Sequence, residues 1–373
     1  MNEATSTMLL IGVGGAGAMM ARGIRRAFGE EIRYLLADTD AATGQMDEPF
    51  VLLGGNRLSG RGAGGNLVQA RLAAEDSIQM LDGPLEGVRL AVIVAALGGG
   101  TGGGATLEAV THLASIGIPS IVFATIPFTF EGDDRQRNSR GVINMIAEKA
   151  NATFSISLDK LIGPVDNMNE AMRRAVDTLA SGVTFFWRLI GRPGYLRLDA
   201  ERMRHLLSCA GAGRFATVTV QGENRADDAV KALSNSRLLT EGSGPVRAIL
   251  CGILAGDDLR LSEVGQIADG VRETFGKRCT FELATVNDEA TFAGRISVVV
   301  MLFEADFRGG IAAGTEGGAP LAQPGRGARP KSRDMLSRGP TGRGRFSQSE
   351  PTIWNREDVD TPTYLRRNIA LDF

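Results

Sequence analysis

A glycine-rich segment of nine residues, Leu97 to Ala105, has the composition of a phosphate-binding loop. It reads L-G-G-G-T-G-G-G-A and follows the apolar run Leu90–Ala96, which is typical of a buried parallel strand. Glycine lacks a Cβ atom, so backbone N–H groups can approach a ligand closely. A helix expected to begin near Thr106 would add the positive end of its dipole. Because a flexible linker seldom lies between a buried strand and an amphipathic helix, the segment predicts a phosphate cradle with Thr101 as a hydroxyl donor.

A second phosphate loop is predicted near the N-terminus. The sequence Gly12-Val13-Gly14-Gly15-Ala16-Gly17 follows a short apolar run and precedes an amphipathic helix, which is the order of the dinucleotide-binding fingerprint. Asp38 and Asp40 lie near the distance, about 20 positions further on, at which an acidic residue suits a ribose. Taken alone, this loop favours an NAD-dependent oxidoreductase. A dinucleotide fold does not need a second, longer glycine cradle, so the two loops together argue against that class.

Composition limits the class of protein further. The chain has 373 residues, a formal net charge of −2 and a pI of about 5.9, which leaves room for two domains and a tail and gives no basic bias toward nucleic acid. The spacing of the three cysteines, Cys209, Cys251 and Cys279, suggests no pairing, and each lies in an apolar segment of the sequence. The chain has two histidines, so no metal site made of protein side chains is expected. The short polar N-terminus and the lack of an apolar run of about 18 residues favour a cytoplasmic protein without direct membrane insertion.

Strands and helices alternate in the first part of the chain, which predicts an α/β fold with a parallel sheet and helices on both faces. The predicted strands are Met8–Gly12, Ile32–Ala37, Leu90–Ala96, Ser120–Thr125 and Thr153–Leu158. A long helix from about Asn167 to Ile190 follows and ends before Arg192-Pro193-Gly194, a clear stop signal. We therefore expect a first domain over residues 1–166 and a central helix over residues 167–191.

A smaller mixed α/β domain is expected over residues 192–306. Its predicted strands are Arg214–Val220, Val246–Leu254, Thr280–Val286 and Ile296–Glu304, and its predicted helices are Arg225–Leu233 and Leu261–Phe275. Residues 307–351 are rich in Gly, Pro, Ser and Arg and can bury too little apolar surface to offset the entropy of ordering, so they predict a disordered linker. The basic excess of this linker serves either solubility or a weak attraction to acidic surfaces. Apolar residues return over residues 352–373, as in a docking peptide.

Taken together, these segments resemble the tubulin/FtsZ family of GTPases over nearly the whole chain apart from the linker. The cradle Gly98–Gly104 is similar to the family's signature GGGTG followed by Ser, Thr or Gly and then Gly, and the first loop to its G-x-G-G-x-G. The other resemblances are Asp38-Thr39-Asp40-Ala41, Gly62-Ala63-Gly64-Gly65-Asn66 with Arg71, Pro127-Phe128-Thr129-Phe130-Glu131-Gly132 with Arg135, Gly222-Glu223-Asn224-Arg225-Ala226, Gly256-Asp257-Asp258-Leu259 and Thr361-Pro362-Thr363-Tyr364-Leu365-Arg366-Arg367.

The resemblance implies a tubulin/FtsZ fold, with a Rossmann-like GTP-binding domain, a long central helix and a smaller mixed α/β domain. It also implies a site for GTP or GDP, with Mg²⁺ accompanying GTP, that a loop of the next subunit in a filament completes. Glu131 would bind the ribose, and Arg135 would lie near the phosphates. The residues implied to bind the nucleotide are Gly12, Gly14, Gly15, Ala16, Gly17, Asp38, Asp40, Ala63, Gly64, Gly98, Gly99, Gly100, Thr101, Gly102, Gly103, Pro127, Glu131, Arg135 and Asp177.

Partners and location follow from the same resemblance. The family implies homopolymeric protofilaments in the cytoplasm, at the division site, with no nucleic-acid partner. The C-terminal peptide would bind membrane-tethering division proteins. The residues implied for that contact are Pro362, Tyr364, Leu365, Arg366 and Arg367.

The catalytic loop departs from the family pattern N-x-D-x-x-D. An ungapped alignment places Arg197, Asp199 and Arg202 at its three fixed positions, so the middle acid alone is kept. A guanidinium in place of a water-positioning carboxylate predicts a large loss of rate, although Glu201 stands beside the lost acid and Arg202 could stabilise phosphate charge. Two functions follow: a division GTPase that hydrolyses GTP slowly through Asp199, Glu201 and Arg202, or a non-hydrolysing accessory protein that co-assembles with a second, active FtsZ and regulates it.

The residues that read the base in the family also differ here. Ala18 and Leu158 stand where the family has asparagines, and its Asn-Asp pair on the long helix appears as Asp177-Thr178. The aromatic residue that stacks on the base falls near Met172 or Arg173. Asp177 could accept hydrogen bonds from guanine that adenine cannot donate. The sequence therefore predicts a guanine preference that is weaker than usual in the family.

Overall fold

The computed structural model describes residues 7–28, 32–161, 167–191, 194–198, 200–208, 211–240 and 244–304, and the backbone of residues 353–354 and 357–358. The chain divides into two units, Met1–Ala312 and Ala313–Phe373. In the second unit, β11 (Ile353–Trp354) pairs with β12 (Glu357–Asp358) in antiparallel fashion. The linker predicted over residues 307–351 and the peptide residues Pro362 to Arg367 lie outside the described residues.

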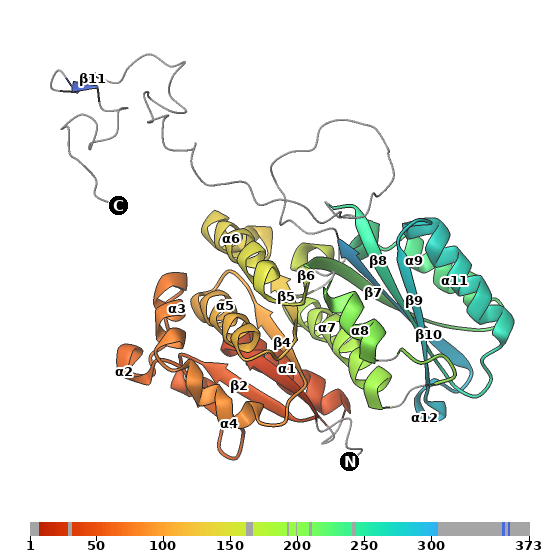
Figure 1. Cartoon of the computed structure of the whole chain (residues 1–373), viewed down its shortest axis with the longest axis horizontal. Helices are drawn as coiled ribbons and strands as arrows, with labels where there is room; N and C mark the ends of the chain where they lie inside the picture. Colours follow the sequence, from red (N-terminus) through yellow and green to blue (C-terminus); the bar gives the residue numbers. More distant parts are fainter. Residues whose placement is uncertain are drawn as a thin grey trace, which may run out of the picture. The chain divides into compact units, whose positions relative to one another are not determined.

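One sheet runs through the described part of the first unit, in the order β3-β2-β1-β4-β5-β6-β7-β10-β8-β9 (Figure 1). Its first six strands are parallel: β1 (Met8–Val13), β2 (Tyr34–Asp38), β3 (Phe50–Leu52), β4 (Leu90–Ala96), β5 (Ser120–Ile126) and β6 (Ala152–Ser157). The helices that connect them are α1 (Gly14–Phe28), α2 (Gly55–Leu58), α3 (Leu67–Glu75), α4 (Asp82–Leu85), α5 (Gly100–Ser115) and α6 (Asp133–Lys149).

The parallel strands supply two separate cores, because successive side chains of a strand point to opposite faces of the sheet. In β1, Leu10 packs into a core that includes the inner face of α1, whereas Leu9 and Ile11 pack into a second core with α5. The neighbouring strand β4 repeats this alternation with Val92 and Ile93. This burial on both faces explains the continuous apolar runs in the sequence.

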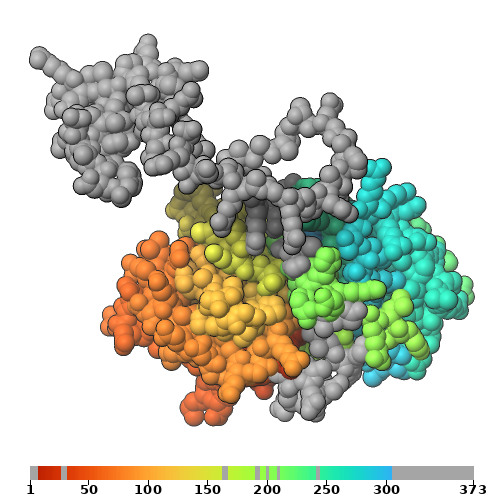
Figure 2. All heavy atoms as spheres, in the orientation of Figure 1, coloured from red at the N-terminus to blue at the C-terminus, as the bar shows by residue number. Residues whose placement is uncertain are grey.

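The last four strands form the sheet of a C-terminal domain, in which β10 is antiparallel to β7 and β8, and β9 is parallel to β8. These strands are β7 (Ala212–Gln221), β8 (Val246–Ala255), β9 (Thr280–Asn287) and β10 (Arg295–Glu304). The helices of this domain are α8 (Ala200–Ser208), α9 (Arg225–Ser234), α10 (Arg237–Thr240), α11 (Leu261–Phe275) and α12 (Glu289–Phe292). Figure 2 shows the two domains as adjoining lobes, orange to yellow and green to blue.

The long helix α7 (Met168–Gly191) contacts both domains: α1 and β5 on one hand, and β7, β9 and β10 on the other. Two glycines make this packing close. A Cβ atom on Gly182 of α7 would lie 2.6 Å from the ring of Phe123, and one on Gly252 of β8 would lie 2.0 Å from the ring of Phe185. An aromatic ring of β5 therefore packs on the backbone of this helix, and an aromatic ring of the helix packs on the backbone of β8.

The fold predicted from the sequence is confirmed, and every predicted strand is present with ends displaced by at most about two residues. The short edge strand β3 was not predicted. The prediction that the helix after the cradle begins near Thr106 is wrong, since α5 begins at Gly100 and the glycines form its first turn. Cys251 lies buried in β8, but Cys279 lies in the bend before β9 and not within a helix or strand; Cys209 is outside the described residues.

Candidate functional site

Two helices begin at one edge of the parallel sheet, side by side. Strands β1 and β4 pair in register, with Val13 opposite Ala95, and α1 begins at Gly14 directly after β1, while α5 begins at Gly100 shortly after β4. The N–H groups in the first turn of a helix have no partner within that helix, and the helix dipole makes this end positive. Both helix ends border a cavity of about 580 Å³. The cavity is therefore suited to an anion such as a phosphate chain.

Most glycines of the two loops allow close packing of the backbone. A Cβ atom on Gly17 would lie 2.6 Å from the carbonyl oxygen of Val94, and one on Gly102 would lie 2.0 Å from that of Ala96. Gly99 differs, because a Cβ atom there would meet nothing within 4 Å although the residue lines the cavity. The glycines thus bring the two helix ends together, and Gly99 leaves room for a ligand.

A third loop completes this side of the cavity. Gly64 and Gly65 have φ values of +58° and +79°, a conformation that glycine adopts readily, and both line the cavity. The next residue, Asn66, caps α3 by accepting a hydrogen bond from the N–H of Gln69 (3.1 Å). A Cβ atom on Gly100 would lie 2.9 Å from the carbonyl oxygen of Asn66, so this loop packs directly on the start of α5.

Hydroxyl groups connect the loop after β2 to the cradle. The hydroxyls of Thr39 and Thr101 lie 2.7 Å apart, and Thr39 is fully buried. Asp38 accepts hydrogen bonds from the N–H of Thr39 (2.7 Å) and from the hydroxyl of Thr43 (2.6 Å). Asp40 accepts one from the N–H of Ala42 (2.9 Å). Both carboxylates line the cavity and also hold the turn that they belong to.

Glu131 and Arg135, which the family resemblance assigns to the ribose and the phosphates, form an ion pair with each other. The same carboxylate accepts a hydrogen bond from the N–H of Phe128 (2.9 Å). Arg135 lies in the first turn of α6 and its side chain is more than half exposed, whereas the Glu131 side chain is 23% exposed. Both residues line the cavity. A nucleotide there would meet the Glu131 carboxylate, which the N–H of Phe128 and the Arg135 guanidinium hold in place.

Most of the nucleotide-binding residues suggested by the sequence line this one cavity. These are Gly14, Gly15, Ala16, Gly17, Asp38, Asp40, Ala63, Gly64, Gly99, Gly100, Thr101, Gly102, Pro127, Glu131 and Arg135. The lining does not include Gly12, Gly98, Gly103 or Asp177. The first three of these pack against neighbouring chain segments, and Asp177 is an exposed residue of α7. Sequence reasoning missed other lining residues: no motif gave a signal for Thr43, Thr125 or Met168, and Phe130 was given no role although it lies within the motif Pro127–Gly132.

The loop that follows α7 is fastened to β9. The N–H of Gly194 donates to the carbonyl oxygen of Thr285 (2.8 Å), and the N–H of Leu196 donates to its hydroxyl (2.9 Å). Of the residues predicted to be catalytic, Asp199 lies outside the described residues. Arg202 of α8 forms an ion pair with Glu282 of β9, with 3.4 Å between Nη1 and Oε2. Glu201 pairs with Arg204 on the exposed side of α8 (2.7 Å).

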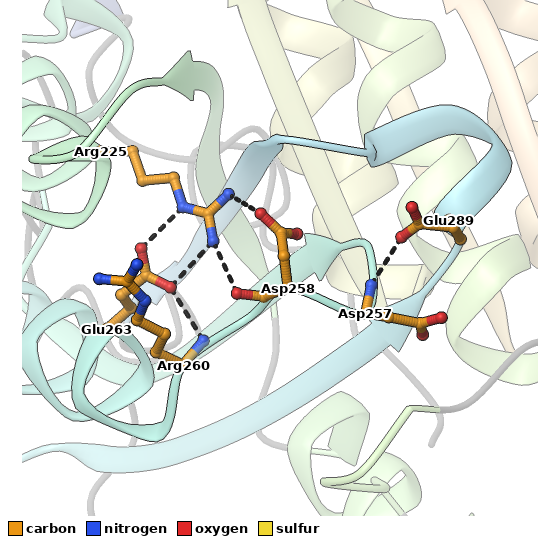
Figure 3. Close-up of polar contacts among 6 residues, drawn as sticks. All are labelled: Arg225, Asp257, Asp258, Arg260, Glu263 and Glu289. Atoms are coloured by element: carbon orange, nitrogen blue, oxygen red, sulfur yellow. Dashed lines mark hydrogen bonds and ion pairs between the residues drawn. The ribbon is translucent and has the colours of Figure 1, made fainter.

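The two second-domain motifs meet in a cluster of charges in which Arg225 and Glu263 are buried, whereas Asp257, Asp258 and Glu289 are exposed (Figure 3). The Arg225 guanidinium lies between Glu263, with 2.7 Å from Nε to Oε1, and Asp258, with 2.6 Å from Nη1 to Oδ2. Glu263 also accepts from the N–H of Arg260 (2.9 Å), and the N–H of Asp257 donates to Glu289 (2.7 Å). The hydrogen bonds from Arg225 lower the pKa of Glu263 below its usual value despite burial. The cluster holds the turn between β8 and α11.

Replacing Arg225 by Met is expected to lower the free energy of unfolding by about 3–5 kcal/mol, because Glu263 would stay buried without its partner. Arg57→Met, which removes an exposed ion pair with Asp76, is the matched control and should leave the unfolding midpoint nearly unchanged. The pKa of Glu263 is lower in the folded than in the unfolded state. The stability that its ion pair contributes is therefore fully present above about pH 4.3, the unfolded pKa, and is lost as the pH falls through the folded pKa. Thermal unfolding of both variants at neutral pH and near pH 4 measures this. Equal losses in the two variants would contradict the assignment.

Among the described residues, no helix is long and apolar enough to cross a membrane. The same residues contain no group of three or more His, Cys, Asp and Glu side chains that could hold a metal ion.

Comparison with known proteins identifies similar sequences. The family model described as "Tubulin/FtsZ family, GTPase domain" matches residues 7–166. The chain is 29% identical over 369 residues to the cell division protein FtsZ of Pseudomonas aeruginosa, covering 97% of this chain and 89% of that protein. It is 30% identical over 297 residues to the protein of the same name from Magnetospirillum gryphiswaldense, covering 78% of this chain and 53% of that protein.

Solved structures agree on the fold. A dimer of FtsZ from M. jannaschii, described as empty, has a TM-score of 0.72 and 23% identity, covering 80% of this chain and 88% of that one. CetZ2 from Haloferax volcanii, described as a GTPγS-bound protofilament, has a TM-score of 0.67 and 21% identity, covering 81% of this chain and 94% of that one.

Proposed function

Because the chain belongs to the tubulin/FtsZ family, we propose that it is a GTP-binding, filament-forming protein of bacterial cell division that hydrolyses GTP slowly. The observation that carries the proposal is the cavity at the N-terminal ends of α1 and α5, with Gly99 open to a ligand and Thr101 beside it. Phosphates would bind to the first-turn N–H groups, and Glu131 would bind the ribose. Mg²⁺ would accompany the triphosphate; we assign it no ligand among the protein side chains.

Exposed apolar side chains on two faces support head-to-tail assembly. Tyr195 and Leu261, near the loop after α7 and at the start of α11, are 75% and 87% exposed. Phe130 and Met168, at the cavity, are 67% and 54% exposed. Contacts between two different faces of the same protein repeat from subunit to subunit and generate filaments. In such a filament the loop of one subunit would lie over the nucleotide of the next, at the division site in the cytoplasm.

Slow hydrolysis follows from the side chains on that loop and on α8. A carboxylate that orients the attacking water accelerates hydrolysis, whereas Arg197 and Arg202 stand at two of the three positions where the family has Asn or Asp. Arg202 is paired with Glu282 of its own subunit. Asp199 would orient the water, with Glu201 the nearest second carboxylate in the sequence.

The same two arginines favour a second candidate function. A subunit that binds GTP but cannot position water would persist in filaments and would act as a non-hydrolysing accessory protein in polymers of an active FtsZ. The two functions share the nucleotide site and the assembly faces. They differ in turnover and in whether the chain assembles alone.

Light scattering, electron microscopy and phosphate release test this function on the full chain with GTP. We expect GTP-dependent protofilaments and a rate of phosphate release far below that of an active FtsZ measured in parallel. Filaments that form only when an active FtsZ is added would favour the accessory function. A chain that binds no guanine nucleotide, by calorimetry or by analysis of the purified protein, would exclude both.

The C-terminal peptide is proposed to bind a membrane-tethering division protein, on the strength of its resemblance to the family's peptide and of the apolar and basic residues that it combines. Deleting residues 352–373 should leave nucleotide affinity unchanged and abolish recruitment to the division ring, as seen with a fluorescent fusion in cells. A deletion variant that still localises to the ring would remove the peptide from the proposal.

A further inference from the structure

The buried hydroxyl of Thr39 contacts a hydroxyl at the cavity, that of Thr101. Thr39 follows β2 and is fully buried, whereas Thr101, in the first turn of α5, is partly buried and lines the cavity. The two oxygen atoms lie 2.7 Å apart. Among the residues that the structure describes, neither hydroxyl has another hydrogen-bond partner. The contact therefore joins a side chain outside the cavity to one that lines it.

The backbone of Thr39 is held on both sides, which fixes the position of its hydroxyl. Its N–H donates to the Asp38 carboxylate (2.7 Å), and its carbonyl oxygen accepts from the N–H of Gly62 (3.1 Å). Thr101 lies against the start of α1, because a Cβ atom on Gly14 would be 3.6 Å from the Cβ atom of Thr101. The two hydroxyls thus meet where the loop after β2 contacts the helix ends that border the cavity.

The difference in burial decides which of the two hydroxyls donates. A threonine hydroxyl has one hydrogen to donate and can accept two hydrogen bonds. If Thr101 donated to Thr39, the hydrogen of Thr39 would remain unpaired at a position without access to solvent, which costs free energy. If Thr39 donates to Thr101, its hydrogen is paired, and the hydrogen of Thr101 is left to point into the cavity, where water or a ligand can accept it. The second arrangement is therefore the stable one.

A phosphate group in the cavity would use the hydrogen of Thr101. Ionised phosphate oxygens accept hydrogen bonds and cannot donate them, so a hydroxyl binds such an oxygen only through its hydrogen. A hydroxyl that turned its lone pairs toward the phosphate would repel it. Because the oxygen of Thr101 already accepts from Thr39, its hydrogen is oriented before the ligand arrives, and less freedom is lost on binding.

We propose that Thr39 is a positioning residue of the nucleotide site: it donates a hydrogen bond to Thr101 and thereby directs the hydroxyl hydrogen of Thr101 toward a phosphate group of the nucleotide. The inference rests on the proposed function and adds to its site a residue that does not touch the ligand. Thr39 is not part of the cavity lining, so it acts through Thr101.

Calorimetric titration of the full chain with GTP, at subunit concentrations too low to scatter light, tests the inference. Thr39→Val keeps the branched shape and removes the hydroxyl, and it should weaken GTP binding by about three- to tenfold. Thr39→Ser keeps the hydroxyl and should bind GTP as the natural chain does. The matched control is Thr106→Val, at a buried threonine of α5 whose hydroxyl has no hydrogen-bond partner among the described residues. It should leave the affinity unchanged.

The Thr101→Val variant separates positioning from a merely structural role. In this background Thr39→Val should cause no further loss of GTP affinity, because the hydroxyl that Thr39 directs is absent. An equal loss in both backgrounds, a loss that Thr39→Ser does not restore, or a natural affinity in Thr39→Val would each overturn the inference and leave the proposed function intact. A natural chain that binds no GTP would overturn both.

The contact has a second readout that needs no nucleotide. Thr101→Val should lower the unfolding midpoint of the nucleotide-free chain, because the hydroxyl of Thr39 would stay buried without an acceptor. Adding Thr39→Val should recover part of this loss, since two apolar groups of the same shape leave no polar group unpaired. Thermal unfolding of the single and double variants measures the effect. A double variant that is no more stable than Thr101→Val would contradict the inferred hydrogen bond.

Discussion

The double variant Arg197→Asn, Arg202→Asp should hydrolyse GTP about a hundred- to a thousandfold faster than the natural chain. Restoring one preorganised group that positions the attacking water is worth about 3–4 kcal/mol of transition-state stabilisation, which corresponds to that factor. Filaments should become correspondingly short-lived, because hydrolysis would precede their disassembly. Phosphate release and the decay of light scattering after a limited dose of GTP measure the two effects.

The design must take account of Glu282, which pairs with Arg202 in the natural protein. An aspartate at position 202 would face this carboxylate, so Glu282→Gln is combined with the double variant to remove the repulsion. Arg140→Asp, an exposed charge reversal on α6, is the control and should leave the rate unchanged. Asp199→Ala should abolish the remaining activity. A natural chain that already turns over GTP as fast as an active FtsZ would mean that Glu201 or Arg202 performs the chemistry.

Gly99→Asp should weaken nucleotide binding by about a hundredfold or more without unfolding the protein. The backbone of Gly99 is extended, with φ of −85° and ψ of 169°, a conformation open to any residue, and a Cβ atom there meets nothing within 4 Å. The new carboxylate would therefore enter the space assigned to the phosphates. Two like charges about 4 Å apart repel by about 4 kcal/mol at an effective dielectric constant of 20. Calorimetry with GTP and with GDP measures the loss.

The control for Gly99→Asp is Gly265→Asp, on the exposed side of α11. A Cβ atom at Gly265 also meets nothing within 4 Å, so both variants add the same charge at an open glycine. The control should bind nucleotide as the natural chain does. If Gly99→Asp binds normally while its unfolding midpoint is unchanged, the phosphates lie elsewhere and the cradle assignment is wrong.

Local patterns were sufficient to predict the α/β class and the strands, whereas the tubulin/FtsZ fold was implied by the family resemblance. Apolar runs such as Leu90–Ala96 mark strands buried on both faces, and the stop signal at Gly194 marks the end of the long helix. The glycine spacing also located the cradle, because loops after neighbouring parallel strands must lie at the same edge of the sheet. The start of α5 could not be predicted in this way. Helix propensity disfavours glycine, yet Gly102 belongs to the first turn because a larger residue would collide with Ala96.

Contacts between distant residues were not predictable from one sequence. The pairing of Arg202 with Glu282 joins residues 80 positions apart, and nothing in either local pattern signals the other. The hydroxyl contact between Thr39 and Thr101 is of the same kind. The stacking of Phe128 on Phe130 beside Leu158 and Met172 was also not predicted, since these residues come from three segments that only the folded chain brings together. Asp177 was assigned by motif position alone, without a view of the helix face to which it belongs.

The interlocking of α7 with both domains limits how the molecule can deform. Turning this helix about its own axis would drive the ring of Phe185 into the backbone at Gly252 and would separate Gly182 from the rings of Phe123 and Phe215. Packed aromatic cores have low compressibility and resist such shear. A displacement at the cavity end of α7, near Met168, would therefore reach its other end, near Gly194, as a displacement of the whole helix, with little loss to bending in between.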